Sequence, residues 1–242
     1  MKRVLIDAGN TRVKWAVVNG NKVLSSGALP IEQVRELPKQ LADIDSIRQI
    51  WVSNVAGEAV AQNIRNFSVS RSCQTHFIVA QKVQCGVSNS YVDAIQLGCD
   101  RWAALIAAWH LVSKECLVVN CGTATTVDTL NNQGVFTGGL ILSGIELMQQ
   151  SLANKAAQLK AESGQYVLFP LNTADAIFSG AIQANCGAIQ RQYDLLEDGS
   201  APIVLGGGAS AILQPHLQNL PVRVADNLVL QGLLLIAQEA SR

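Results

Sequence analysis

The chain is poor in charge and in histidine, and this scarcity excludes several classes of protein. Charged residues make up 15% of its 242 residues, and 18 lysines and arginines balance 18 aspartates and glutamates. A general nucleic-acid or anionic-membrane binder needs an excess of cations, so we expect neither partner. The three histidines are isolated, at positions 76, 110 and 216, and none has the spacing of a zinc-binding motif.

Long apolar runs and paired cysteines are also missing. The longest apolar stretches, 103–112 and 228–237, are too short and interrupted to span a bilayer. None of the six cysteines forms a CxxC pair, so neither a zinc ribbon nor a thioredoxin-type site is indicated. The first three residues lead directly into an apolar strand, without the features of a secretion signal. We therefore expect a cytoplasmic protein with reduced, structural thiols.

Residues 4–11 (VLIDAGNT) are the stretch around which the chain is organised. An apolar run ends at Asp7, and a tight turn with Gly9 leads to a returning strand at 12–18. Glycine lets backbone N–H groups approach a ligand closely, and a carboxylate beside such a turn can hold a hydrated Mg²⁺. The pattern predicts a phosphate-binding hairpin. The alternative is an ordinary β-hairpin whose Asp and Asn serve the turn.

The same pattern recurs at residues 117–126 (LVVNCGTATT), 113 residues further along. Asn120 then takes the place of Asp7, and Gly122 that of Gly9. An internal repeat of nearly half the chain predicts two similar lobes, 1–112 and 113–242, with one nucleotide held in a cleft between the two hairpins. A third element, 203–210 (IVLGGGAS), runs from a strand into three glycines, against which a flat group can lie.

The remaining pattern alternates strands and helices, which predicts an α/β fold. Residues 84–97 show no period and are expected to form a polar loop that includes Tyr91. Further strands are expected at 22–28, 47–55, 75–79, 127–130 and 135–142, and helices at 31–41 (broken near Pro38), 57–66, 144–159, 174–196 and 228–237.

Asp100 and Arg101 begin the most regular helix of the first half. Its apolar residues, Trp102, Leu105, Ile106 and Trp109, share one face. A carboxylate in the first turn of a helix is often a plain cap. Held ionised beside an arginine fork, it can instead accept a hydroxyl proton during phosphoryl transfer. Both interpretations fit the residues alone.

Taken together, these motifs resemble a known family. DAGNT at 7–11, GTAT at 122–125 and GGGAS at 206–210 resemble the actin/hexokinase/Hsp70-like ATPase superfamily. Within it, the chain resembles the type III pantothenate kinases through GCDR at 98–101, NTADA at 172–176 followed by Gly180, and DNLVLQG at 226–232. The resemblance runs from Lys2 to about Ala237, nearly the whole chain.

The resemblance implies two similar actin/ribonuclease-H-like lobes and an activity, the ATP-dependent phosphorylation of pantothenate to 4'-phosphopantothenate, the first step of coenzyme A biosynthesis. It implies Asp100 as the base, Mg²⁺ held through water by Asp7, and a homodimer with pantothenate near the interface. ATP and its phosphates would contact Asp7, Ala8, Gly9, Asn10, Thr11, Arg12, Val13, Lys14, Gly122, Thr123, Gly206, Gly207 and Gly208. Pantothenate would contact Tyr91, Gly98, Cys99, Asp100, Arg101 and Thr173.

Two alternatives to this function remain open at this stage. The first is a kinase of the same fold with another small hydroxylated acceptor, such as an amino sugar, and the second is a nucleotide-binding accessory protein without turnover. Tyr91 has its own alternative, a ring that packs under the loop. For assembly, the Trp102/Trp109 stripe and the glycine-bearing helix at 174–196 offer apolar surface for a second copy.

The chain departs from the family at Asn120. The family usually has Asp there, associated with a bound monovalent cation, K⁺ or NH₄⁺. Asparagine keeps a carbonyl oxygen but loses the formal charge. We therefore expect a monovalent-cation site that is weakened in this protein.

Overall fold

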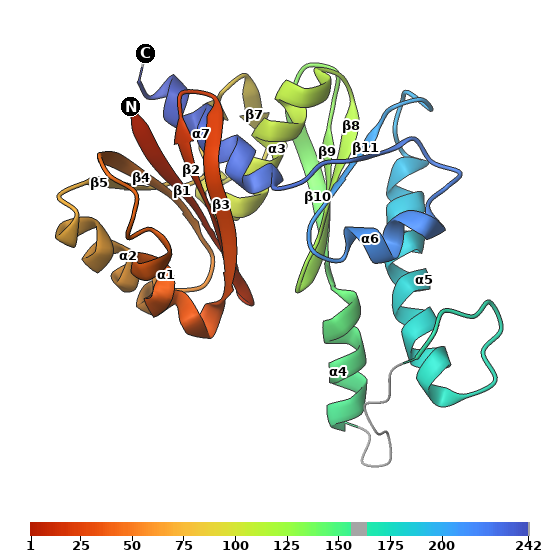
Figure 1. Cartoon of the computed structure of the whole chain (residues 1–242). Coiled ribbons are helices and arrows are strands. Elements are labelled where there is room, and N and C mark those ends of the chain that lie inside the picture. The colour runs from red at the N-terminus through yellow and green to blue at the C-terminus, as the bar shows by residue number, and fades with distance from the viewer. Residues whose placement is uncertain (156–163, 242) are drawn as a thin grey trace. The chain divides into compact units, whose positions relative to one another are not determined.

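In the computed structural model, residues 1–155 and 164–241 are described, and they belong to two compact units (Figure 1). The first unit comprises Met1–Leu111 and Asn227–Arg242, and the second comprises Val112–Asp226. The expected division of the chain is wrong in one respect, because it placed 227–242 in the second lobe. Helix α7 (Leu228–Glu239) instead packs on the sheet of the first unit.

The sheet of the first unit has the strand order β3-β2-β1-β4-β5. Its first three strands form an antiparallel meander, and β4 and β5 run parallel to β1. The strands are β1 (Lys2–Ala8), β2 (Arg12–Asn19), β3 (Lys22–Pro30), β4 (Ile47–Asn54) and β5 (Gln74–Phe77).

The two faces of this sheet have different neighbours, because successive side chains of a strand point to opposite faces. Val4 and Ile6 of β1 share a buried cluster with Ile64 of α2 (Glu58–Ser70), as do the core residues of β4. The same cluster includes residues of η1 (Ile31–Glu36) and α1 (Leu37–Gln40). Asp7 and Ser53, which are neighbours in the parallel register of β1 and β4, therefore lie on the opposite face.

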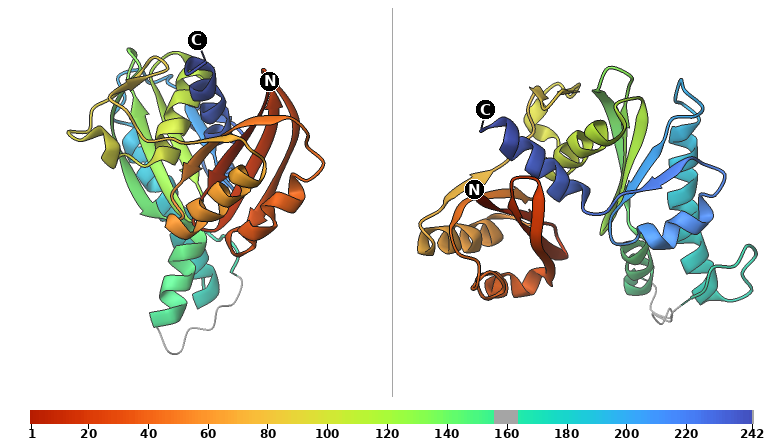
Figure 2. Two further views of the ribbon diagram at one scale, coloured as in Figure 1. Left: turned by 90° about the vertical axis from the view of Figure 1, so that its left-hand side faces the viewer. Right: turned by 45° about the horizontal axis from the view of Figure 1, so that its top comes forward.

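That opposite face is covered by helices from distant parts of the chain. Helix α7 lies against β1 and β4 (Figure 2), and it crosses α3 (Cys99–Val112). A Cβ on Gly232 of α7 would lie 1.9 Å from the carbonyl oxygen of Ala103, so only glycine permits this approach. Between β5 and α3 run β6 (Val83–Gln84), β7 (Val87–Asn89) and η2 (Ala94–Gln96). The stretch expected as a loop thus contains a short hairpin.

The second unit repeats the strand order of the first. Its strands follow the order β10-β9-β8-β11-β12, again a meander followed by two parallel strands. They are β8 (Cys116–Cys121), β9 (Ala124–Leu130), β10 (Val135–Ser143), β11 (Ile203–Gly206) and β12 (Val222–Val224). The internal repeat predicted from the two glycine turns is therefore confirmed at the level of topology.

Helices cover one face of this second sheet. Leu117, Val119 and Leu205 share a buried cluster with Ile182 and Ile189 of α5 (Thr173–Tyr193). Leu213, which ends α6 (Ser210–Leu213), and the chain just after η3 (Gln214–His216) add to this cluster. Helix α4 (Ile145–Lys155) packs against α5 (Figure 1).

Several predicted boundaries differ from the observed ones. The helix expected at 31–41 is the 3-10 helix η1 followed by the single turn α1, with the break just before Pro38. Strand β9 begins at Ala124 rather than 127, because the β-branched Thr125 and Thr126 are buried on the strand. Residues 156–159 of the expected helix at 144–159 lie outside the described residues. Among the helices described here, none is long and apolar enough to span a membrane.

Candidate active site

The end of β1 and the turn after it form the first part of the candidate site. The backbone N–H of Gly9 donates to the carbonyl of Arg12 at 3.0 Å, which closes a short turn with Asn10 and Thr11 exposed at its tip. Ala8 and Val13, on either side, have fully buried side chains. These two residues therefore offer only backbone atoms to a ligand.

Asp7 is the electrostatically unusual residue of this turn. Burial, and secondly the negative charge of Asp100, raise the pKa of Asp7 from 3.8 to about 7, while Lys14 opposes the shift. Lys14 is the residue opposite Asp7 in the register of β1 and β2. The influence of Asp100 on Asp7 shows that two predicted site residues, 93 positions apart in the chain, lie close together.

The start of α3 fixes the carboxylate of Asp100. The backbone N–H of Arg101 donates to Asp100 Oδ1 at 2.8 Å, and the carbonyl of Gly98 accepts from the N–H of Trp102 at 3.0 Å. A Cβ on Gly98 would lie 2.7 Å from the same Oδ1. Glycine at position 98 therefore leaves the room in which the Asp100 carboxylate sits.

The thiol of Cys99, a predicted substrate contact, is directed at the end of β4. Its thiol sulfur lies 3.4 Å from the hydroxyl of Ser53 and donates to the carbonyl of Asn54 at 3.6 Å. Burial raises the pKa of the Cys99 thiol. Only the backbone of Cys99 is left to contact a substrate.

Ser53 and Asn54 were not predicted as part of the site. Ser53 is fully buried and lies beside Asp7 in the parallel register. A signal for both residues was present in the sequence, because IWVSN at 50–54 is an apolar strand that ends in polar residues, as VLID at 4–7 does.

Tyr91 and Arg101, both predicted to bind the substrate, are joined directly. Arg101 Nη1 donates to the hydroxyl oxygen of Tyr91 at 3.3 Å, although Arg101 is almost fully buried. The alternative for Tyr91, a ring that only packs under the loop, does not account for this contact. A buried guanidinium with a phenol beside it suits an anionic or hydroxylated ligand.

The second unit has its own glycine turn at the corresponding place. Asn120 is next to Gly206 in the parallel register of β8 and β11, as Asp7 is next to Ser53 in the first unit. The N–H of Gly122 donates to the carbonyl of Ala124 at 2.9 Å, so this turn is one residue shorter than the first. Thr123, at its tip, is exposed.

The three consecutive glycines at and after the end of β11 have different surroundings. Gly206 is buried on the strand. Gly207 has a φ of +96°, and a Cβ there would lie 2.2 Å from the carbonyl oxygen of Cys121. Gly208 is exposed, and a Cβ would meet nothing within 4 Å. Gly207 is thus required by packing within the unit, whereas Gly208 leaves an open surface.

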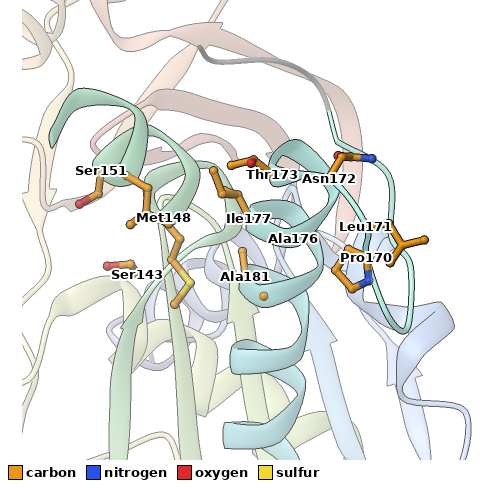
Figure 3. A pocket seen from close by; sticks show the side chains of 12 residues that line it. Ser143, Met148, Ser151, Pro170, Leu171, Asn172, Thr173, Ala176, Ile177 and Ala181 are labelled. Atoms are coloured by element: carbon orange, nitrogen blue, oxygen red, sulfur yellow. The ribbon is translucent and has the colours of Figure 1, made fainter. Parts of the chain in front are cut away.

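A pocket of about 810 Å³ lies between α4, the chain before α5, and α5 itself (Figure 3). Thr173, the predicted substrate contact, lies on its rim and is exposed. Thr173 is the first residue of α5 and does not cap it. Asn172 is the cap, and its side chain accepts from the N–H of Asp175 at 2.9 Å. The pocket lining is Ser143, Met148, Ser151, Leu152, Pro170, Leu171, Asn172, Thr173, Ala176, Ile177, Gly180 and Ala181.

The residues present fit a magnesium ion held mainly by its nucleotide. Among the described residues, no group of three or more His, Cys, Asp or Glu is arranged to hold a metal. Mg²⁺ in kinases is usually bound by one or two carboxylates, several waters and substrate phosphates. Asp7 suits that arrangement, because burial and Asp100 disfavour its negative charge more than Lys14 favours it, and a divalent cation would supply the missing compensation.

The repeated strand order, with glycine turns after β1 and β8, defines an α/β protein of the actin/hexokinase-like ATPase fold. A solved structure assigned as a 2-dehydro-3-deoxygalactonokinase from Sinorhizobium meliloti shares this fold, with a TM-score of 0.63 and 14% identity, over 98% of this chain and 96% of that one. A sequence model of the family named type III pantothenate kinase matches residues 3–195. The chain belongs to the type III pantothenate kinase family.

Curated relatives agree over almost the whole chain. The type III pantothenate kinase of Nitrosospira multiformis is 44% identical over 98% of this chain and 91% of that protein. That of Aromatoleum aromaticum is 44% identical over 98% of each. The protein is therefore a kinase, and the family resemblance recognised in the glycine turns and in residues 98–101 is confirmed.

Proposed function

We propose that this kinase transfers the γ-phosphoryl group of ATP to the primary hydroxyl of pantothenate and releases 4'-phosphopantothenate and ADP. The observation that carries the assignment is that the charge of Asp100 acts on Asp7, while Arg101, the residue after Asp100, is joined to Tyr91. One carboxylate suits a metal–phosphate group and the other suits the hydroxyl of an acceptor. This reaction would be the first step of coenzyme A biosynthesis.

Asp100 is the proposed base. Its carboxylate accepts the proton of the pantothenate hydroxyl as that oxygen bonds to the γ-phosphorus and the bond to the β-phosphate oxygen breaks. The backbone N–H of Arg101 holds the carboxylate in place at 2.8 Å. Phosphoryl transfer depends more on positioning and charge neutralisation than on a strong base, so a carboxylate at a helix start suffices.

Arg101 and Tyr91 are the proposed contacts of pantothenate. The substrate carries a carboxylate, an amide and hydroxyls, and a guanidinium is the side chain best shaped to receive a carboxylate. Their mutual contact at 3.3 Å orients both groups before the substrate arrives. Gly98, Cys99 and Thr173 are the further proposed contacts of pantothenate.

The glycine turns are the proposed nucleotide contacts. The backbone of residues 8–13, with the exposed side chains of Asn10, Thr11 and Arg12, would bind the phosphates, and Lys14 would add a positive charge. Gly122 and Thr123 would do the same in the second unit, and Gly206 to Gly208 would border the adenosine. Asp7 would hold Mg²⁺ through water, and the ion when bound neutralises phosphate charge.

Assembly and the monovalent cation belong to the same proposal. We assign a cytoplasmic homodimer. The stripe expected to supply its surface is a wrong choice, because Trp102 is fully buried within its own unit. A better candidate is the segment before α5, where Phe169 is 86% exposed and Leu171 is 100% exposed. Asn120, in place of the family's usual Asp, would bind K⁺ or NH₄⁺ weakly.

The decisive experiment measures ADP release from Mg²⁺–ATP with and without pantothenate, with the phosphorylated product identified by mass spectrometry. We expect release that depends on pantothenate and a product heavier by one phosphoryl group. An acceptor panel that includes amino sugars tests the same-fold alternative. Turnover with an amino sugar but not with pantothenate would reject the assignment, and nucleotide binding without any turnover would favour an accessory protein.

The assembly is tested separately. Sedimentation velocity of the wild type is compared with that of a Phe169→Ser/Leu171→Ser double variant. We expect a dimer for the wild type and a shift toward monomer for the variant, because serine at both positions removes apolar surface that the dimer interface would bury. A wild-type protein that is monomeric and fully active at assay concentrations would reject the homodimer.

A further inference from the structure

We propose that Asn89 is a positioning residue for pantothenate, which it affects by fixing the place of Tyr91. The inference rests on the proposed function and adds to it a residue that contacts no substrate. Asn89 ends β7, two positions before Tyr91, and its side chain is only 1% exposed. A buried amide must have its hydrogen bonds satisfied, so its partners show what it holds.

Both polar groups of the Asn89 side chain bind the backbone of the segment that carries Tyr91. Its Oδ1 accepts from the backbone N–H of Tyr91 at 3.0 Å. Its Nδ2 donates to the carbonyl of Ala94 at 3.1 Å, and its backbone N–H donates to the carbonyl of Lys82 at 2.9 Å. One side chain thus joins the start and the end of the segment 89–94.

Little else on this segment is packed. Val92 is fully exposed and Ile95 is 69% exposed, so neither side chain supplies apolar contacts that would hold the backbone. Other hydrogen bonds of this stretch are longer, from the Ile95 N–H to Asp93 Oδ1 at 3.3 Å and from Lys82 Nζ to the Tyr91 carbonyl at 3.5 Å. The two bonds of the Asn89 side chain, at 3.0 and 3.1 Å, are therefore a large part of what keeps the segment in one conformation. Each such bond contributes about 1 kcal/mol when it replaces water contacts.

The hairpin of β6 and β7, which leads into the segment 89–94, is anchored to α3, the helix that carries Asp100 and Arg101. Trp102 Nε1 donates to Gln84 Oε1 at 2.8 Å, and His110 Nε2 lies 3.1 Å from the carbonyl oxygen of Cys85. Glu239 of α7 accepts from the backbone N–H of Cys85 at 2.9 Å. Strand β7 is therefore tied to α3, as the neighbouring positions of these elements in Figure 1 show.

The route from Asn89 to the substrate is short. The hairpin is held on α3, Asn89 fixes the backbone of residue 91, and the Tyr91 hydroxyl meets Arg101 Nη1 at 3.3 Å. Without Asn89, the Tyr91 backbone loses its hydrogen-bond acceptor, and Tyr91 samples positions in which it cannot complete the pantothenate contact. Asp7 and Asp100 are not touched by this change.

The test is steady-state kinetics on Asn89→Ala and Asn89→Ser. For Asn89→Ala we expect the KM for pantothenate to rise about 10-fold, with kcat and the KM for ATP within about 2-fold of wild type. Serine can accept the Tyr91 N–H more weakly, so Asn89→Ser should give an intermediate KM. This variant also carries the test if Asn89→Ala does not fold.

Asn131→Ala is the matched control. Asn131 Oδ1 likewise holds a turn, accepting from the N–H groups of Gln133 and Val135 at 3.0 and 2.9 Å, but that turn joins β9 and β10. We expect Asn131→Ala to lower the melting temperature without changing either KM. An equal rise in the pantothenate KM for both variants would show that Asn89→Ala acts through a general loss of stability, and would overturn the proposal.

A double-mutant cycle with Tyr91→Phe separates the proposal from the function on which it rests. Because Asn89 acts through Tyr91, its effect on the pantothenate KM should fall below about 3-fold in the Tyr91→Phe background. Fully additive effects would overturn the proposal while leaving pantothenate kinase activity intact. A wild type without turnover of pantothenate would instead reject both.

Discussion

The hydroxyl oxygen of Ser53 lies 3.4 Å from the thiol sulfur of Cys99, and this contact joins α3, the helix that carries Asp100, to β4, the strand paired with the one that carries Asp7. Ser53 is the neighbour of Asp7 in the parallel register, and Cys99 precedes Asp100. The separation of the two carboxylates is therefore set by a strand, a helix start and a buried contact. A site built on such rigid elements needs little rearrangement when substrates bind.

The first prediction concerns the proposed base. Asp100→Asn should lower kcat by roughly 10²-fold or more, because the amide cannot accept the hydroxyl proton. Binding of a non-hydrolysable ATP analogue, measured by calorimetry, should remain within about 3-fold of wild type, since Asp100 is assigned no nucleotide contact. Turnover close to that of the wild type would remove Asp100 from this role.

The second prediction concerns pH and the stability of the protein without nucleotide and Mg²⁺. The folded-state pKa of Asp7 is raised from 3.8 to about 7. Between pH 3.8 and 7, Asp7 therefore keeps its proton in the folded protein but loses it in the unfolded chain. The contribution of Asp7 to stability is therefore fully present below pH 4, and is lost as the pH rises through 7. By pH 8 the free energy of unfolding has fallen by as much as about 4 kcal/mol. Solvent screening of the exposed part of the Asp7 side chain makes the actual decrease smaller.

Asp7→Asn removes this titration without changing the size of the side chain. We expect the variant to be inactive, yet more stable than wild type at pH 8 and similar to it at pH 4. Urea denaturation of both proteins at several pH values measures the difference. A wild-type-minus-variant difference that does not change between pH 4 and 8 would show that the Asp7 carboxyl is not perturbed.

The third prediction uses two adjacent glycines as their own control. Gly207→Ala should lower the free energy of unfolding by roughly 2 kcal/mol or more, because its Cβ would collide with the backbone of Cys121 and its φ is +96°. Gly208→Ala should change it by less than about 0.5 kcal/mol. If the adenosine lies against this turn, Gly208→Ala should still raise the KM for ATP. An unchanged KM for ATP in a stable Gly208→Ala protein would contradict that placement.

The fourth prediction concerns the monovalent cation. A unit charge about 4 Å from a cation is worth on the order of 4 kcal/mol at an effective dielectric near 20, before desolvation is subtracted. Even part of that weakens cation binding by tens of fold when Asp is replaced by Asn. We expect weak activation by K⁺, or none, and stronger activation in Asn120→Asp.

Turnover against KCl at constant ionic strength, with a bulky organic cation as the filler, tests this in both proteins. Tight activation of the wild type, with no gain in Asn120→Asp, would show that other oxygens control the cation site.

The fold and the family could be predicted from the sequence because their signals are local. An apolar strand that ends in a polar residue and a glycine turn occurs at Asp7 and again at Asn120, and the observed strand order repeats with it. The roles of the individual site residues stay predictions, including Asp100 as base and Thr173 as substrate contact. Local patterns do not contain the distances that decide such roles.

What could not be predicted depends on contacts between distant segments. The contact of the Cys99 thiol with Ser53 and Asn54 on β4 had no signal in the sequence around Cys99, because these partners lie 46 and 45 residues earlier in the chain. The sequence predicted a polar loop at 84–97, whereas the side chain of Asn89 in that stretch is buried. Helix α7 carries no pattern that tells which sheet it covers. Its glycine at 232 is explained only by the backbone of α3.

The return of α7 to the first unit has a consequence for the order in which the protein can form during synthesis. The second unit is one continuous stretch, Val112–Asp226, and all of its strands leave the ribosome before Leu228. The first unit is begun earlier but lacks the helix that covers β1 and β4 until the last residues are made. The half of the protein that carries Asp7 and Asp100 is thus started before the second unit and completed after it, with one face of its sheet uncovered in the meantime.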